Sequence, residues 1–320
     1  MTNTGEVCVL DLVTVGRSLV DFYPVSDGPL VGVTTYEQMV GGSPTNVAVG
    51  AARLDLCAAV VGSVGDDPLG AVVLDRLSTT GVDVSMITVV ADARTTVATC
   101  ELIGDAAQAL IYRGSPSADH RAHLSESDEE AIALAPLRWI SGCALAEDIA
   151  RQLTTRVISL GSPTHVILDV DYRDAYWPSL ETAGEVLREA VAQVDIVVAN
   201  VDEARIVVGP GEPRELAERL RALGCAIAII KRGEHGVLVV DSARATEVAP
   251  WPVIAVNGLG AGDAFGAALC RGLNDAMPIV TACEFASAAG AIVASRRESS
   301  VAMPTYGQIT SFMNRSARVA

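Results

Sequence analysis

The sequence predicts an α/β fold in which helices cover both faces of a mostly parallel sheet. Short apolar runs alternate with longer segments of helical period along most of the 320 residues. Consecutive apolar runs of this kind are typical of strands that are buried on both faces. Half of all residues are hydrophobic, which is enough for one large α/β core but hardly for two.

The predicted elements follow one another as β-α-β units. Five apolar runs are predicted strands: 7–15, 57–64, 166–170, 196–199 and 226–231. Five segments of helical period are predicted helices: 44–55, 68–80, 147–160, 179–193 and 212–223. Ligands of such sheets bind outside the carboxyl ends of the strands, so motifs at strand ends are candidate sites.

Two regions depart from this alternation. Residues 19–40 and 95–113 form short alternating patterns interrupted by Gly, Pro and Asp turns. We expect them to pair into a small sheet outside the main core. Such a sheet would act as a lid that excludes water from a reactive ligand.

The charge balance excludes several classes of partner. A net charge of −16 disfavours nucleic acid, which is bound by clustered Lys and Arg. The N-terminus has no basic segment followed by a long apolar run, and no stretch approaches the ~18 apolar residues needed to span a bilayer. We therefore expect a cytoplasmic protein without a membrane partner.

The seven cysteines have no metal-ligand spacing and are expected to be buried free thiols.

A glycine-rich segment at 256–265 opens a predicted helix. Gly260 and Gly262 would let backbone N–H groups approach an anion at the helix N-terminus. Asp263, in the first turn, could accept a proton from an attacking hydroxyl. The alternative is a plain glycine turn with Asp263 as an ordinary first-turn carboxylate. A dinucleotide fingerprint would need a glycine at Asp263, and a Walker A loop would need a Gly-Lys pair that this chain lacks.

A second glycine motif lies at 41–48. Its sequence predicts a helix that starts with Ser43 as the cap and Pro44 at the first helical position. Asn46, in the first turn, can offer both a donor and an acceptor to a polyol. Simple helix capping is the alternative interpretation.

Together these two segments resemble the two signature segments of the ribokinase-like, or PfkB-type, carbohydrate kinases. Further matches occur in order along the chain: 16–21, 65–70, Asn200 with Glu203, and 231–233. The details are most similar to 5-dehydro-2-deoxygluconate kinases, through Gly16-Arg17, 21–24, 169–173 and Trp177. The resemblance implies a ribokinase-like three-layer sandwich with a small β-sheet lid, forming one kinase domain over residues 1–320.

The resemblance also implies roles for particular residues. Asp263 would be the catalytic base, and the backbone of Gly260, Ala261 and Gly262 would form the anion hole. Substrate contacts would come from Asp21, Gly42, Asn46, Arg113 and Arg173, with the two arginines reaching an acidic group. Surface arginine and a solvated carboxylate are the alternatives for the charged members of this set.

For the nucleotide, the resemblance implies contacts from Asn200, Glu203, Lys231, Gly233 and Gly236. Glu203 would act on Mg²⁺ through water, which suits a hard cation that keeps its waters, and helix capping is the alternative for Asn200. Lys231 is the only lysine of the chain. ATP is the expected nucleotide, although nothing in these residues distinguishes it from GTP, and relatives bind a monovalent cation such as K⁺ near Asn257 and residues 295–303.

The expected activity is transfer of the γ-phosphoryl group of ATP to a primary hydroxyl of a sugar or sugar acid. The resemblance favours 5-dehydro-2-deoxy-D-gluconate, phosphorylated at its 6-hydroxyl in inositol breakdown. The sequence leaves 2-dehydro-3-deoxygluconate, fructose, ribose and a nucleoside open as substrates. Outside the kinase class, a non-catalytic sugar or nucleotide sensor and a dinucleotide-dependent oxidoreductase are the alternatives. Both a monomer and a homodimer remain open.

Overall fold

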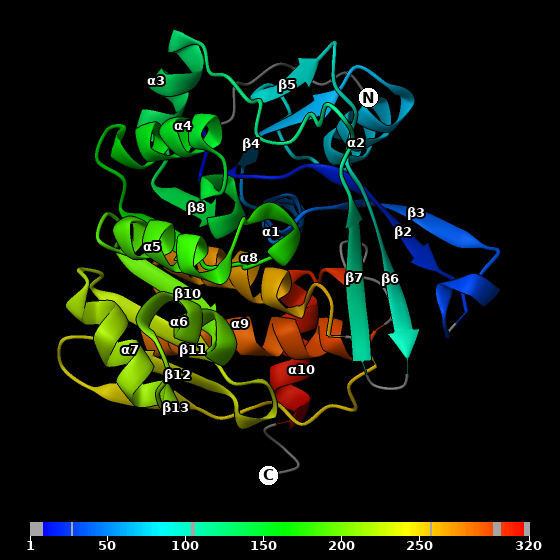
Figure 1. Ribbon diagram of the computed structural model, residues 1–320. Coiled ribbons are helices and arrows are strands. Elements are labelled where there is room, and N and C mark those ends of the chain that lie inside the picture. The colour runs from blue at the N-terminus through cyan, green and yellow to red at the C-terminus, as the bar shows by residue number, and fades with distance from the viewer. Residues whose placement is uncertain (1–8, 27, 104–105, 257, 297–301, 317–320) are drawn as a thin grey trace.

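The computed structural model describes residues 9–26, 28–103, 106–256, 258–296 and 302–316. Its centre is a nine-stranded sheet in the order β13-β12-β11-β10-β9-β8-β1-β4-β5 (Figure 1). The strands from β11 to β5 run parallel, whereas β12 and β13 are antiparallel additions at one edge. The main sheet consists of β1 (Leu12–Val15), β4 (Ala58–Gly65), β5 (Ile87–Val90), β8 (Leu137–Ser141), β9 (His165–Asp169), β10 (Ile196–Asn200), β11 (Ile227–Lys231), β12 (Val237–Val240) and β13 (Ala245–Val248).

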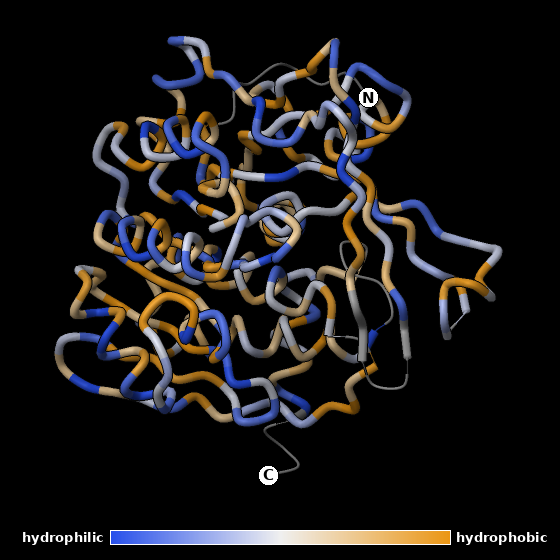
Figure 2. Tube along the Cα trace, in the orientation of Figure 1, coloured by the Kyte–Doolittle hydropathy of each residue, from blue (hydrophilic) through white to orange (hydrophobic). Residues whose placement is uncertain are grey.

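Helices cover both faces of this sheet and bury a separate hydrophobic cluster on each. One layer contains α1 (Ser43–Arg53), α2 (Pro68–Thr79), α8 (Ala261–Asn274), α9 (Ile279–Ala294) and α10 (Tyr306–Ser316). The other layer contains α3 (Glu126–Leu134), α4 (Asp148–Ser159), α5 (Leu180–Val191), α6 (Val201–Val208) and α7 (Pro213–Ala222). Figure 2 shows hydrophobic residues concentrated along the central strands. The predicted three-layer α/β architecture is therefore confirmed.

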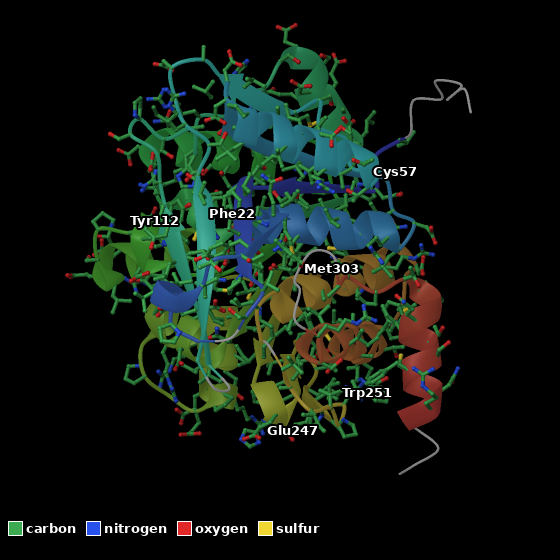
Figure 3. The ribbon with its side chains drawn as sticks, turned by 90° about the vertical axis from the view of Figure 1, so that its right-hand side faces the viewer. Phe22, Cys57, Tyr112, Glu247, Trp251 and Met303 are labelled. Carbon is green, nitrogen blue, oxygen red and sulfur yellow. The ribbon has the colours of Figure 1, made fainter. Side chains whose placement is uncertain are left out.

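A second, four-stranded sheet projects from one side of the molecule (Figure 1). It pairs the two segments that departed from the β-α-β alternation, in the order β3-β2-β6-β7. Its strands are β2 (Leu19–Pro24), β3 (Tyr36–Gly41), β6 (Val97–Ile103) and β7 (Ala106–Tyr112). Figure 3 looks onto this side, with Phe22 of β2 and Tyr112 of β7 labelled.

Some local predictions were wrong. The run at 7–15 contributes a strand only from Leu12 to Val15, and residues 7 and 8 lie outside the described part of the chain. Ser43 does not cap α1, because Gly42 takes the N-cap position with φ 99° and the Ser43 hydroxyl bonds elsewhere. Cys57 is disulfide-bonded, whereas Cys143, Cys225, Cys270 and Cys283 are buried free thiols as expected.

A helix that crosses a bilayer needs about 20 consecutive, predominantly apolar residues. None of the described helices is both long enough and apolar enough to cross a membrane.

Candidate active site

A cavity lies between the small sheet and the amino ends of α1 and α8. Alternate residues of β2 line it, namely Leu19, Asp21 and Tyr23, because every second side chain of a strand points to the same face. Ala109 and Ile111 of β7 line it in the same way. The small sheet therefore covers the cavity with one of its faces.

Asp263 enters this cavity from the first turn of α8. The helix begins after Gly260, whose φ of 80° is a left-handed conformation that glycine adopts without strain. The first N–H groups of a helix have no intrahelical acceptor, and here the Ala261 amide lies 3.4 Å from the Gly258 carbonyl oxygen. The Gly262 amide belongs to the same turn, so the segment offers backbone donors and partial positive charge next to Asp263.

Two side chains from the start of α1 hold the Asp263 carboxyl group. The Ser43 hydroxyl donates to Oδ1 at 2.7 Å, and Asn46 Nδ2 donates to Oδ2 at 2.8 Å. Burial raises the pKa of Asp263 above its usual value, and these two hydrogen bonds oppose that shift. Asn46 Oδ1 is buried and has no hydrogen-bond partner within the described part of the chain, so it can still accept a hydrogen bond from a ligand hydroxyl.

Asp21 is the second carboxyl group in the cavity. Burial and the neighbouring Asp263 raise the pKa of Asp21 to about 7, against the opposing effect of Arg17. The Asp21 side chain lies over Gly41, and a Cβ there would meet its carboxyl oxygens at 2.2 and 2.5 Å. Gly42 also lines the cavity, and a Cβ on it would lie 2.3 Å from the carbonyl oxygen of Arg17.

Two guanidinium groups line the same cavity, from Arg17 and Arg173. Both contact Asp171, which binds Arg17 Nη2 through Oδ2 at 3.0 Å and Arg173 Nη2 through Oδ1 at 3.0 Å. Burial raises the pKa of Asp171, but Arg173, Arg17 and a hydrogen bond from Ser141 outweigh it and lower the pKa below its usual value. Asp171 thus holds both guanidinium groups at the edge of the cavity.

Arg113, which was expected to reach an acidic group from the lid, is not among the residues lining the cavity. Its guanidinium group bonds to Glu147, lies 3.5 Å from Asp119 and stacks 4.8 Å from the centre of the Tyr176 ring. These contacts draw the side chain toward α4 instead of the cavity. The structure therefore places Arg113 behind the site, and Arg17 occupies a position that the sequence prediction had not assigned.

A more open groove of about 450 Å³ lies at the carboxyl ends of β10 and β11. Lys231 and Gly233 line it, as does Asn200. Lys231 Nζ lies 3.4 Å from Oδ1 of Asp169 and 3.4 Å from the position of a Cβ at Gly262, so it connects the groove to the start of α8. Burial disfavours its charge, but Asp169, Glu203 and Asp263 outweigh that effect and raise its pKa.

Three other residues expected at the nucleotide have contacts within the protein. Asn200 caps α6, since its Oδ1 accepts the Glu203 N–H at 2.8 Å, and the Glu203 carboxylate accepts the Asn200 N–H at 2.7 Å. Gly236, with φ 75°, does not line the groove; a Cβ there would lie 2.1 Å from the Val248 carbonyl oxygen. Packing against β13 explains this glycine without a ligand.

Ser43 and Arg17 line the cavity although neither was predicted to do so from the sequence. The only sequence signal for them was their position next to glycine in the two N-terminal motifs. Within the described residues, no group of three or more His, Cys, Asp or Glu side chains is arranged to hold a metal ion. The region expected to bind a monovalent cation lies partly outside the described residues, at Asn257 and 297–301.

Comparisons with known proteins agree on one family. The model described as "pfkB family carbohydrate kinase" matches residues 9–306. A 5-dehydro-2-deoxygluconokinase from Clostridium botulinum (strain Eklund 17B / Type B) is 31% identical over 314 residues, which cover 95% of this chain and 92% of the relative.

Solved structures share the fold. A putative ribokinase II from E. coli, solved in complex with ATP and Mg²⁺, superposes with a TM-score of 0.84 at 21% identity, covering 96% of this chain and 99% of that one. A fructokinase double mutant from Vibrio cholerae O395, solved with fructose, ADP and potassium ion, superposes with a TM-score of 0.81 at 25% identity, covering 95% and 98% of the two chains.

Proposed function

This chain belongs to the pfkB family of carbohydrate kinases, and we propose that it transfers the γ-phosphoryl group of ATP to the 6-hydroxyl of 5-dehydro-2-deoxy-D-gluconate. The named activity of the relative that is 31% identical over nearly the whole chain supports this substrate. The presence of guanidinium groups in the cavity is consistent with an acid.

One observation carries the kinase chemistry. Asp263 lies in the cavity at the amino end of α8, with its two carboxyl oxygens bonded to Ser43 and Asn46. A carboxyl group fixed at both oxygens is oriented toward one position, which favours proton transfer from a bound hydroxyl.

In the proposed reaction Asp263 accepts the proton of the primary hydroxyl as its oxygen attacks the γ-phosphorus. A bond forms between that oxygen and phosphorus, the bond to the bridging oxygen breaks, and ADP leaves. Backbone amides at Gly260, Ala261 and Gly262 stabilise the charge that develops on the phosphoryl oxygens. The Ala261 amide, which lies 3.4 Å from Gly258, must turn toward the phosphoryl group to take part.

The substrate would be held by Asp21, Gly42 and Asn46 through its hydroxyl groups, and by Arg173 through its carboxylate. Asn46 would thus serve both the base and the substrate, because its Nδ2 is bonded to Asp263 while its Oδ1 has no partner within the described part of the chain. Arg113 would contact the substrate only if it left Glu147.

The nucleotide would occupy the groove along β10 and β11, where Lys231 lies next to the start of α8. Gly233 would allow close approach of its phosphates. The Glu203 carboxylate lies near Lys231 and fits an indirect contact with Mg²⁺ through water. When bound, Mg²⁺ would neutralise phosphate charge, and a K⁺ ion like that named for the fructokinase would add to it.

The test is magnesium-ATP turnover by the purified protein against sugar acids, neutral sugars and nucleosides, with Asp263→Asn as the control. We expect turnover of 5-dehydro-2-deoxy-D-gluconate that depends on Asp263. Turnover that is faster with another compound of the panel would support the kinase activity but contradict the proposed substrate. No turnover of any compound, with nucleotide or sugar still bound, would favour a sensor instead.

A further inference from the structure

Arg17 lies at the base of the substrate cavity, in the turn between β1 and β2. We propose that Arg17 is a specificity-determining residue that binds the substrate carboxylate together with Arg173. The inference rests on the proposed function, because it assumes an acid substrate in this cavity. It adds a second guanidinium group to the single contact assigned to Arg173.

The two arginines share one counter-ion. Asp171 accepts from Arg17 through one carboxyl oxygen and from Arg173 through the other, and Ser141 donates a further hydrogen bond at 2.6 Å. One negative charge thus faces two positive charges. A substrate carboxylate would supply the second negative charge, and its planar shape suits the guanidinium fork.

No other carboxyl group near the cavity acts as a second counter-ion for Arg17 within the described part of the chain. Both oxygens of Asp263 accept hydrogen bonds from α1, and Asp21 has a pKa raised to about 7, which makes it a weak counter-ion at neutral pH. Glu203 approaches Arg173 only to 4.0 Å. None of them forms an ion pair with Arg17 within the described part of the chain.

Arg17 is held rigidly. Its side chain is 3% exposed, and its guanidinium carbon stacks 4.7 Å from the centre of the Tyr176 ring. Its Nε–H has no acceptor within the described residues, so the protein leaves some of its five donors unused. An unsatisfied donor on a buried cation is costly, which favours a ligand that brings an acceptor.

This arrangement would also reject neutral sugars. A neutral sugar would leave the buried Arg17 and its neighbour Arg173 with one counter-ion between them, whereas an acid would supply a second, so only the acid gains this ion pair. Arg173 cannot provide this discrimination alone, because its side chain is 41% exposed and water can solvate its charge. Arg17 is buried, so water cannot solvate its charge when the ligand lacks a carboxylate. We therefore expect Arg17 to contribute most of the preference for an acid.

The experiment compares D-gluconate with D-glucitol, which differ only in having a carboxylate or a hydroxymethyl group at C1. Both are measured as ligands by calorimetry and as inhibitors of turnover, using wild type, Arg17→Met, Arg17→Lys and Arg173→Met. In Arg17→Met we expect the dissociation constant for gluconate and the KM for the acid substrate to rise about 10- to 100-fold. This is the range expected for the loss of a hydrogen bond to a charged group. Glucitol binding should stay within about twofold, and kcat should change much less than KM.

A matched control is Arg121→Met, which breaks an exposed ion pair with Asp92 at 3.1 Å. This variant should change the affinity for neither gluconate nor glucitol. Equal weakening of gluconate and glucitol in Arg17→Met would overturn the proposal and leave Arg17 a structural residue. If that variant does not fold, Arg17→Lys decides. It keeps the charge but loses the fork, so it should weaken gluconate selectively, and an unchanged gluconate-to-glucitol ratio would count against the proposal. Failure of the proposed function shows separately, as wild type that turns over no sugar acid.

Discussion

The Asp21 carboxyl group lies against the backbone of Gly41, so closely that a Cβ at residue 41 would stand 2.2 Å from Oδ2 of Asp21. The two residues lie on the paired strands β2 and β3 of the small sheet. Real side-chain carbons do not approach oxygen this closely, so any residue other than glycine must displace the carboxyl group.

We therefore expect Gly41→Ala to impair substrate binding while the fold persists. Moving Asp21 removes a contact to the substrate hydroxyls, and KM for the sugar should rise about tenfold, as for the loss of one hydrogen bond to a charged group. Steady-state kinetics would measure it. Gly32→Ala is the matched control, because a Cβ at Gly32 meets nothing within 4 Å. An unchanged KM in Gly41→Ala would show that Asp21 is not needed in its present position.

Asp263→Asn should lower kcat by about 10²- to 10⁴-fold, the usual range for losing a general base. The amide is nearly the same size, so nucleotide affinity measured by calorimetry should change little. The loss should therefore appear in kcat and hardly in the dissociation constant for ATP. Near-normal turnover in a correctly folded variant would reject Asp263 as the base.

Ser43→Ala should change the pH profile of the enzyme. The Ser43 hydroxyl donates to Asp263 and opposes the rise of its pKa caused by burial, so without it the pKa rises further. The base is then ionised only at higher pH, and the acidic limb of kcat/KM should move toward alkaline pH. Loss of one hydrogen bond should also lower kcat at pH 8 by roughly tenfold or less. Ser159→Ala, at an exposed serine that bonds only to its own helix, should leave the profile in place.

Asp21→Asn should stabilise the protein at alkaline pH. The pKa of Asp21 is about 7 in the folded protein and 3.8 without the protein environment. Between these values the folded state holds a proton that the unfolded state has lost, so stability falls as pH rises from about 4 to 7 and stays low above. Asparagine carries no such charge. The stability advantage of the Asp21→Asn variant should grow over that window to on the order of 1 kcal/mol after allowing for partial exposure, which corresponds to about 1–2 °C in Tm.

Thermal unfolding at pH 4 to 8 would measure this difference. Gly32→Ala, which changes no titratable group and whose Cβ meets nothing within 4 Å, is the control, and its difference from the wild type should not vary with pH. A constant Asp21→Asn difference across the range would contradict the raised pKa.

The local sequence was sufficient to predict an element where its hydrophobic period agrees with its burial in the structure. The run at 226–231 became β11 from Ile227 to Lys231, and the glycine segment opened α8 as predicted. Strand β8 was missed because Arg138 interrupts its apolar pattern. The fold buries that guanidinium group completely, and its Nη1 donates to the carbonyl oxygens of Val157 and Ile158 at 2.7 and 3.1 Å. Compensation from a distant helix cannot be inferred from the strand itself.

The site was predictable only in part, because several of its side chains are held by residues that lie far away in the sequence. Asp263 stood out because its own neighbours are glycines at a helix start. Ser43 suggested a cap because serine before proline usually is one, but its hydroxyl bonds to a carboxylate 220 positions away. Arg113 was expected in the cavity, and only the tertiary structure reveals the competing attraction of Glu147.

That long separation between Asp263 and its two partners has a consequence for the life of the chain in the cell. During synthesis the carboxylate emerges when the segment carrying Ser43 and Asn46 has long left the ribosome, and the three groups meet only once α1 and α8 pack together. A nascent, truncated or cleaved chain would hold one half of the machinery without the other. Such fragments should be unable to carry out the proposed phosphoryl transfer, because none of them holds Asp263 between both of its partners.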